Sequence, residues 1–259
     1  MKLILRNFIS TLRRYSASSL LNIAGLSIAF ASLYIIIAQL KYDLTFNQSI
    51  PGYENLYLVT NQGFYGEGTR SSYSSRLLIE EIALSTPLIE QSAPFEARNM
   101  VMPVTQQLKD RTVTHRLDVG RTNKTGLELL GVEIIEGSLD DFDNPTTFKS
   151  WVISQSKAKK YGIKVGDMLY YGTNTSTSNP VAPVVAIYRD VPDNVDFLQY
   201  DIITNIGDDG TKSLNMRTAA QIVRANKTVT AQDLNQKARQ DKIDQIMRVM
   251  PDQVPGQDL

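Results

Sequence analysis

One uncharged, apolar stretch near the start of the chain constrains the fold more than any other feature. Residues Tyr15–Leu40 contain no Asp, Glu, Lys or Arg, and their second half is dense in Ile, Leu, Ala and Phe. At about 1.5 Å per residue, a helix over Leu20–Leu40 is roughly 30 Å long, which matches the hydrocarbon thickness of a bilayer. The sequence therefore predicts one membrane-spanning helix, with bounds at residues 15–41.

Two other interpretations of this stretch fit less well. A signal peptide ends in a small-residue cleavage site followed by polar mature sequence, whereas Ala29-Phe30-Ala31 is followed by the apolar run SLYIIIA. A helix buried in a soluble protein keeps a polar face, and none can be drawn through Ile23–Leu40. We therefore expect the stretch to cross a membrane.

Small residues lie on one face of the expected helix. Gly25, Ala29 and Ser32 are spaced by four and then three positions, and small side chains at such spacing let another helix approach closely. They are our candidates for a helix-packing contact. A lone anchor that happens to contain small residues remains the alternative.

The charges that flank the stretch are asymmetric. On its C-terminal side Lys41 is offset by Asp43. The N-terminal side carries four basic residues and no acidic one: Lys2, Arg6, Arg13 and Arg14. Because positive residues favour the cytoplasmic side of a membrane, we expect residues 1–14 in the cytoplasm and residues 42–259 on the outer side of the membrane.

Residues 1–14 alternate apolar and basic groups at helical spacing. This pattern is typical of an amphipathic helix that lies on an anionic leaflet, with Arg6, Arg13 and Arg14 flanking the membrane. A plain extension of the spanning helix fits the same pattern equally well.

Composition excludes several classes of function. The chain has 27 basic and 27 acidic side chains, so its formal net charge is zero and no nucleic-acid partner is expected. It has no cysteine, which excludes disulfides, thiol nucleophiles and thiolate metal sites. About 215 residues remain outside the expected span, enough for one or two hydrophobic cores.

The residues after the span alternate between strand and helix patterns. We expect strands near residues 56–60, 100–104, 112–119, 151–154, 165–170, 183–188, 200–203 and 220–225, and helices near 74–85, 157–161 and 230–250. The fold class is therefore α+β. It combines one N-terminal transmembrane helix with an outer domain of strand-helix repeats, which contains a β-rich insertion at roughly 96–150.

We find no residues arranged for catalysis. The chain lacks the G-x-x-x-x-G-K-[ST] nucleotide-binding pattern, so an ATPase has to be another chain. Its single histidine, His115, is predicted to be exposed on a strand. Asp140, Asp141 and Asp143 could bind a cation, but they lack the Gly and distal Glu of an EF-hand loop, which favours a solvated acidic turn. We predict that the chain binds no cofactor and no metal ion and that it is not an enzyme.

Several runs together carry a family resemblance. The spanning segment and its exit read SLLNIAGLSIAFASLYIIIAQLKYDLTFNQSIPGYENLYLV, and further on stand GVEIIEGSLDDF, WVISQSKAKKYGIKVGDMLYY and PVVAIYRDVPDNVDFLQYDII. In these runs a strand ends in Ser before an Ala-Lys helix, a Gly-Asp turn follows, and a further strand ends in Asp and Pro. The chain thereby resembles MacB/FtsX-like ABC transporter permeases of the type common in Bacteroidetes, from the N-terminal spanning helix through the periplasmic core domain.

This resemblance implies a permease of the bacterial inner membrane with four spanning helices and a periplasmic domain between the first two. The implied partners are a cytoplasmic ABC ATPase subunit, a second permease subunit in a homo- or heterodimer, the lipid bilayer, and optionally a periplasmic or outer-membrane protein. Only one apolar span precedes Leu259. We therefore expect the chain to be the N-terminal portion of a longer permease.

The leading hypothesis is a permease segment that couples ATP hydrolysis by a separate ATPase to a periplasmic conformational change, for export or mechanotransmission. The alternative is a single-pass sensor or ligand-binding domain, but only about 14 residues precede the span and could form its output module. An anchored periplasmic enzyme is a third hypothesis, and we find no site for it.

Overall fold

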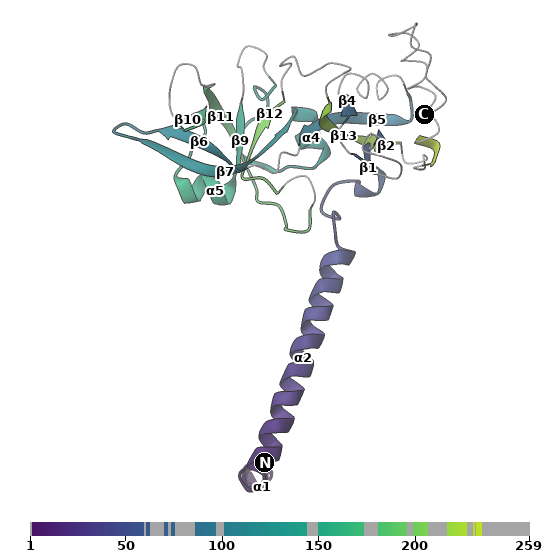
Figure 1. Cartoon of the computed structure of the whole chain (residues 1–259), viewed down its shortest axis with the longest axis vertical. Helices are drawn as coiled ribbons and strands as arrows, with labels where there is room; N and C mark the ends of the chain where they lie inside the picture. Colours follow the sequence, from purple (N-terminus) through teal and green to yellow (C-terminus); the bar gives the residue numbers. More distant parts are fainter. Residues whose placement is uncertain are drawn as a thin grey trace. The chain divides into compact units, whose positions relative to one another are not determined.

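The structure is a computed structural model that describes residues 2–59, 61–62, 70–71, 74–75, 86–96, 101–143, 150–173, 181–195, 199–206, 217–226, 230 and 232–234. The chain divides into two compact units, Met1–Phe46 and Asn47–Leu259. The first is helical, and the second is rich in strands with few helices (Figure 1). The predicted α+β class is confirmed.

The first unit consists of two helices, α1 (Lys2–Arg14) and α2 (Ser16–Leu44). Tyr15 separates them with φ −119° and ψ 48°, outside the helical region. Figure 1 shows α1 nearly end-on at the foot of α2, so the chain bends sharply between the two helices. The assignment of residues 1–14 as a cytoplasmic amphipathic segment stays a prediction.

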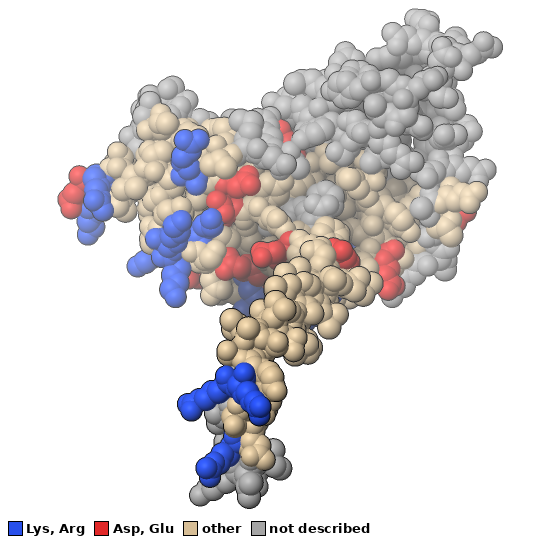
Figure 2. All heavy atoms as spheres, turned by 60° about the horizontal axis from the view of Figure 1, so that its bottom comes forward, with Lys and Arg blue, Asp and Glu red and all other residues tan. Residues whose placement is uncertain are grey.

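Among the described residues, α2 is the one helix that is long and apolar enough to cross a membrane. It has 29 residues, none of them buried. Basic side chains gather at the N-terminal end of this unit, and the helix surface above them is uncharged (Figure 2).

The described residues of the second unit form strands and a few short helices. The strands are β1 (Leu56–Val59), β2 (Asn61–Gln62), β3 (Arg70–Ser71), β4 (Ser74–Ser75), β5 (Ile89–Glu96), β6 (Val101–Gln107), β7 (Thr112–Thr122), β8 (Ile134–Gly137), β9 (Trp151–Ser154), β10 (Met168–Tyr171), β11 (Val181–Tyr188), β12 (Ile202–Asn205) and β13 (Arg217–Ala225). The helices are the 3-10 turn Tyr53–Asn55, α4 (Lys124–Leu129) and α5 (Gln155–Tyr161).

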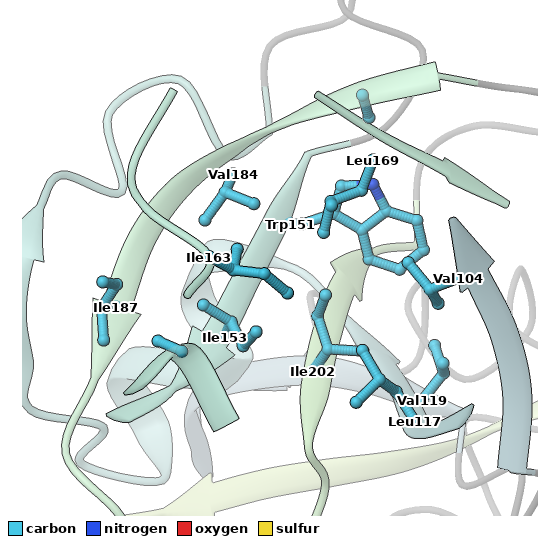
Figure 3. Close-up of a cluster of buried hydrophobic side chains, with 12 residues drawn as sticks. Val104, Leu117, Val119, Trp151, Ile153, Ile163, Leu169, Val184, Ile187 and Ile202 are labelled. Atoms are coloured by element: carbon cyan, nitrogen blue, oxygen red, sulfur yellow. The ribbon is translucent and has the colours of Figure 1, made fainter. Parts of the chain in front are cut away.

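Six strands close into a barrel. Around the ring, β7 pairs with β12, then β9, β11, β10 and β6 follow, and β6 pairs again with β7. The β7–β12 and β9–β11 pairs are parallel and the others are antiparallel. Alternate side chains of these strands point inward and fill the barrel with α5 (Figure 3). The filling includes Val104, Leu117, Val119, Trp151, Ile153, Ala158, Ile163, Leu169, Ala182, Val184, Ile187 and Ile202.

The long strand β7 belongs to two parts of the sheet. The first half of β7 pairs with β6 as part of the barrel wall. The last residues of β7 pair with β5, where Glu96 lies opposite Arg121. From β5 the sheet continues through β13 to β1. A second core combines residues of β5 and β13 with residues of the barrel strands β9, β11 and β12. It comprises Ile50, Phe95, Leu127, Leu130, Phe142, Val152, Ala186, Tyr188, Val195, Ile203 and Ile222.

Most of the expected strands are confirmed, with shifted ends. Helix α5 begins two residues before the predicted 157 and ends, as predicted, at Tyr161, and the next residue, Gly162, has a φ of 67°. The predicted strand over 165–170 starts only at Met168, because the preceding residues form a turn at Gly166 with φ 91°. The boundaries given for the β-rich insertion stay a prediction.

Two predicted helices fall mostly outside the described residues. Ser74 and Ser75, the start of the first, form β4 and pair with β13 instead. In the second, Thr230 and Asp233 form a reciprocal cap, since each accepts a hydrogen bond from the backbone N–H of the other. Residues 76–85 and 235–250 lie outside the described part of the chain.

Candidate functional site

The small face of α2 is open. A Cβ atom added at Gly25 would meet nothing within 4 Å. The hydroxyl of Ser32 donates to the carbonyl oxygen of Ile28 at 2.9 Å, so this polar group is satisfied within the helix. Helical spacing places Gly25, Ala29 and Ser32 together. A second helix packed against them stays a prediction.

Aromatic side chains mark both ends of α2. The guanidinium of Arg14 lies 5.8 Å from the ring centroid of Tyr15, and at the other end the rings of Tyr42 and Phe46 are 6.3 Å apart. Tyr15 and Tyr42 are 27 positions apart in the sequence, or about 40 Å along a helix. This separation matches a bilayer with its headgroup regions, where Tyr side chains are enriched.

The three arginines of the N-terminal segment lie on α1. Arg6, Arg13 and Arg14 are all exposed, and the last two stand in the final turn of the helix. Cations there interact favourably with the carbonyl end of the helix dipole. Because these arginines precede α2, the charge on the two sides of α2 is asymmetric. The predicted orientation depends on this asymmetry.

His115 is buried, so its predicted exposure is wrong. It is 8% exposed, because the alternation of β7 places it on the same side as Leu117, and because Tyr161 of α5 covers its ring with centroids 4.3 Å apart. Its Nε2 lies 3.3 Å from Oε1 of Gln106, whose Nε2 donates to Asp167 at 3.0 Å. Burial lowers the pKa of His115.

This burial predicts a pH-dependent stability. Because the folded chain favours neutral His115, the unfolded chain binds more protons below the ordinary histidine pKa of about 6.5. The free energy of unfolding should therefore fall as the pH drops through that value. We expect the stability difference between the wild-type chain and His115→Gln to shrink from pH 7.5 to 5.5, as measured by urea unfolding in detergent. A difference that is independent of pH would contradict the assignment.

The N-terminus of α5 is capped by a residue that follows another strand. Ser154, at the N-cap position, makes no side-chain cap bond. Instead, both carboxylate oxygens of Asp190 accept from the backbone N–H of Ser156, at 3.1 and 3.2 Å. The parallel pairing of β9 and β11 brings the end of β11 beside the start of α5, which no local pattern reveals.

A second polar contact ties α5 to the barrel strands. The ammonium of Lys157 lies 2.8 Å from one carboxylate oxygen of Asp201, and the other accepts from the backbone N–H of Asp118 at 3.0 Å. Burial and the nearby Asp201 charge raise the pKa of Asp118, while the bond to Asp201 raises the pKa of Lys157. The arrangement joins α5, β7 and the start of β12.

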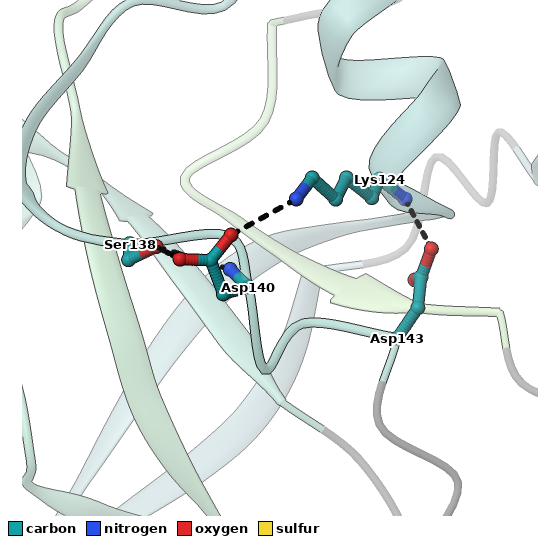
Figure 4. Close-up of polar contacts among 4 residues, drawn as sticks. All are labelled: Lys124, Ser138, Asp140 and Asp143. Carbon is teal, nitrogen blue, oxygen red and sulfur yellow. Dashed lines mark hydrogen bonds and ion pairs between the residues drawn. The ribbon is translucent and has the colours of Figure 1, made fainter.

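In the predicted acidic turn, the carboxylates of Asp140 and Asp143 accept hydrogen bonds from Lys124, the first residue of α4 (Figure 4). Asp140 accepts from the hydroxyl of Ser138 at 2.7 Å and from the ammonium of Lys124 at 3.2 Å. Asp143 accepts from the backbone N–H of Lys124 at 2.8 Å, at the start of the helix. The Ser138 and Lys124 contacts lower the pKa of Asp140. Within the described ranges, no three His, Cys, Asp or Glu side chains are placed to hold a metal ion.

Residues from both units match the model of one protein family. Residues 19–241 match the MacB-like periplasmic core domain, which is well over half of the chain. The protein therefore belongs to this family, the MacB-like periplasmic core domain of ABC transporter permeases. The resemblance inferred from the sequence is confirmed. No curated protein matches the chain.

The solved structures that are similar to the chain include the following three. A permease-protein domain from Porphyromonas gingivalis gives a TM-score of 0.62 at 18% identity, over 79% of this chain and 88% of that one. The periplasmic region of MacB from Actinobacillus actinomycetemcomitans gives 0.48 at 12%, over 78% and 86%. The extracellular domain of the ABC-type transporter YknZ from Gram-positive bacteria gives 0.44 at 11%, over 73% and 92%. The first likeness shows a shared fold.

Proposed function

We propose that the chain is the N-terminal part of an ABC transporter permease subunit, held in the bacterial inner membrane by α2 with its N-terminus in the cytoplasm. The observation that carries this proposal is the family match over residues 19–241, which includes most of α2 and the strand-rich domain. The basic residues before α2 support the orientation.

In this proposal α2 transmits movement to the periplasmic domain. A separate cytoplasmic ATPase binds and hydrolyses ATP, a second permease subunit packs nearby, and the resulting displacement exports a substrate or acts on a periplasmic or outer-membrane protein. The domain suits such a role because β7 runs through both the barrel and the open sheet. Continuous hydrogen-bonded pairing favours movement of the domain as one body.

The orientation can be tested with single cysteines, because the chain has none of its own. Lys159→Cys places a thiol on the exposed surface of α5, and Ser10→Cys places one on α1. A membrane-impermeant maleimide should label Lys159→Cys in intact spheroplasts and Ser10→Cys only after lysis. The reverse result would overturn the proposed topology.

Coupling to ATP needs a separate test. A tagged chain isolated from its own cells in mild detergent should bring with it a subunit that a photoreactive ATP analogue labels. Adding ATP should then change the rate at which maleimide modifies Lys159→Cys. An unchanged rate in a complex that hydrolyses ATP would count against coupling and favour a ligand-binding or sensing domain.

The small face of α2 gives a prediction for assembly. Gly25→Leu fills the space through which a second helix would approach, and we expect the association constant of the dimer to fall about tenfold, which corresponds to roughly 1.4 kcal/mol. Crosslinking in native membranes measures the dimer fraction. Ser27→Leu is the matched control, because it adds similar bulk on another face of α2. Equal dimer fractions in the wild-type chain and Gly25→Leu would exclude this face from the contact.

A further inference from the structure

The segment that follows α2 is fastened to the strand-rich domain by contacts of several kinds. We call residues Asn47–Asn55 the exit segment. The backbone N–H of Asn47 donates to the carbonyl oxygen of Asn194 at 2.9 Å. Ile50 is 2% exposed and belongs to the second core. The 3-10 turn then leads directly into β1. The exit segment is the part of the domain nearest to α2 in sequence, so a displacement of α2 passes along the chain into this segment first.

Arg224 joins the exit segment to two other elements of the domain. Its Nη2 donates to the carbonyl oxygen of Pro51, in the exit segment, and to the carbonyl oxygen of Leu129, at the end of α4, each at 2.8 Å. Arg224 itself lies on β13, opposite Leu56 of β1. A single guanidinium nitrogen therefore connects the exit segment, α4 and β13.

The domain also leaves room for Pro51 beside this contact. Gly131 has φ 68°, a backbone conformation that favours glycine. A Cβ atom added at Gly131 would lie 2.3 Å from Cδ of Pro51, so a larger residue at position 131 would push the proline away. The position of Pro51 thus depends on Gly131 as well as on Arg224.

The contact made by Arg224 opens more readily than a buried ion pair would. Both of its acceptors are neutral carbonyl oxygens, and among the residues that the structure describes no carboxylate forms an ion pair with it. Its Nε is buried without a hydrogen-bond partner, which costs free energy. Opening the contact would return that Nε to water, and this gain offsets part of the two hydrogen bonds that are lost.

We propose that Arg224 is a latch for the exit segment. While Arg224 holds Pro51, the exit segment is part of the folded domain. When Arg224 releases Pro51, the exit segment opens as a unit and the barrel stays folded. The consequence for movement rests on the proposed function: a closed latch passes a displacement of α2 to α4 and β13, and an open latch does not.

Hydrogen exchange of the full chain in detergent tests the latch, through peptides that cover residues 45–56 and 150–154. The backbone N–H groups of Asn47, Ile50 and Tyr53 are hydrogen-bonded and report on the exit segment, whereas β9 reports on the barrel. We expect the exit segment of the wild-type chain to exchange faster than β9. Its rate should not change with urea below the unfolding transition, because a local opening exposes little surface, whereas the rate of β9 should rise with urea.

Two substitutions assign the opening to Arg224. Arg224→Met keeps the apolar stem but removes both hydrogen bonds, and it should speed exchange of the exit segment about tenfold. Arg224→Lys keeps the charge and one donor group, so its effect should be smaller. Arg189→Met is the matched control, because the ion pair of Arg189 with Glu133 is exposed, and it should leave the exit segment unchanged.

Two results would overturn the proposal. If the exit segment and β9 of the wild-type chain exchanged at one rate with one urea dependence, the exit segment would open only when the whole domain unfolds. If Arg224→Met left exchange of the exit segment unchanged, another contact would hold it. The first comparison needs no variant, so it stands even if Arg224→Met does not fold. Neither measurement uses ATP or a second subunit, so failure of the latch and failure of the proposed function are distinguishable.

Discussion

Trp151→Ala should destabilise the strand-rich domain by about 3–5 kcal/mol, as large aromatic truncations in cores do. Trp151 is fully buried inside the barrel, and its ring stacks on Tyr171 with centroids 6.1 Å apart and planes 14° apart. Figure 3 shows its indole close to Leu169 and Val104, so its removal would leave a cavity in this core. Because the strands form a closed ring, the surrounding side chains can move only a little into that cavity.

Urea unfolding of the full chain in detergent, followed by far-ultraviolet circular dichroism, measures this loss. Trp151→Phe should lose clearly less stability than Trp151→Ala, because it keeps an aromatic ring at the site. Val181→Ala is a matched truncation at a side chain that is 39% exposed, and it should change stability only slightly. A loss below about 1 kcal/mol for Trp151→Ala, typical of surface positions, would mean that the barrel interior differs from the one described.

Glu96→Ala should cost a similar 3–5 kcal/mol, because it leaves the charge of Arg121 buried without its partner. The Nη1 of Arg121 lies 2.6 Å from Oε2 of Glu96, and their side chains are only 10% and 4% exposed. The Nη2 of Arg121 donates to the carbonyl oxygen of Ile206 at 3.2 Å, which holds the guanidinium in place. The pair lies where β5 joins β7.

The same unfolding assay, followed by the fluorescence of the single tryptophan, checks this prediction. Glu96→Leu combined with Arg121→Met removes both charges and should recover most of the loss. Glu133→Ala is the control, since it breaks an ion pair with Arg189 whose side chains are 59% and 57% exposed, and exposed pairs contribute little. If Glu96→Ala were as mild as Glu133→Ala, the buried pair would not contribute as described.

Local patterns in the sequence were enough to predict the elements that depend on neighbouring residues. The uncharged run from Tyr15 to Leu40 predicts α2 because length and hydropathy alone define a spanning helix. The β-branched runs at residues 151–154 and 183–188 predict β9 and β11, and Gly162 predicts the end of α5 for a steric reason. The overall α+β class follows from such elements taken in order.

Features that depend on distant residues could not be predicted in this way. His115 looked exposed because nothing near it in the sequence indicates that Tyr161 packs over its ring. The cap of α5 comes from Asp190, 34 positions beyond Ser156. Barrel closure likewise depends on the register between β7 and β12, where Val119 lies opposite Ile202. Strand pairings over such separations are set by the whole core and not by any short motif.

The pairing of β1 with β13 has a consequence for the order of events during synthesis. Leu56 of β1 lies opposite Arg224 of β13. The strand nearest to α2 in sequence, β1, therefore cannot pair with β13 until most of the domain has been synthesised. At about 5–20 residues per second, the delay is roughly 10–30 s. Pairing over such separations also slows folding. The nascent domain therefore emerges with β1 lacking this neighbour, and the open sheet is completed only after the ribosome has passed Arg224.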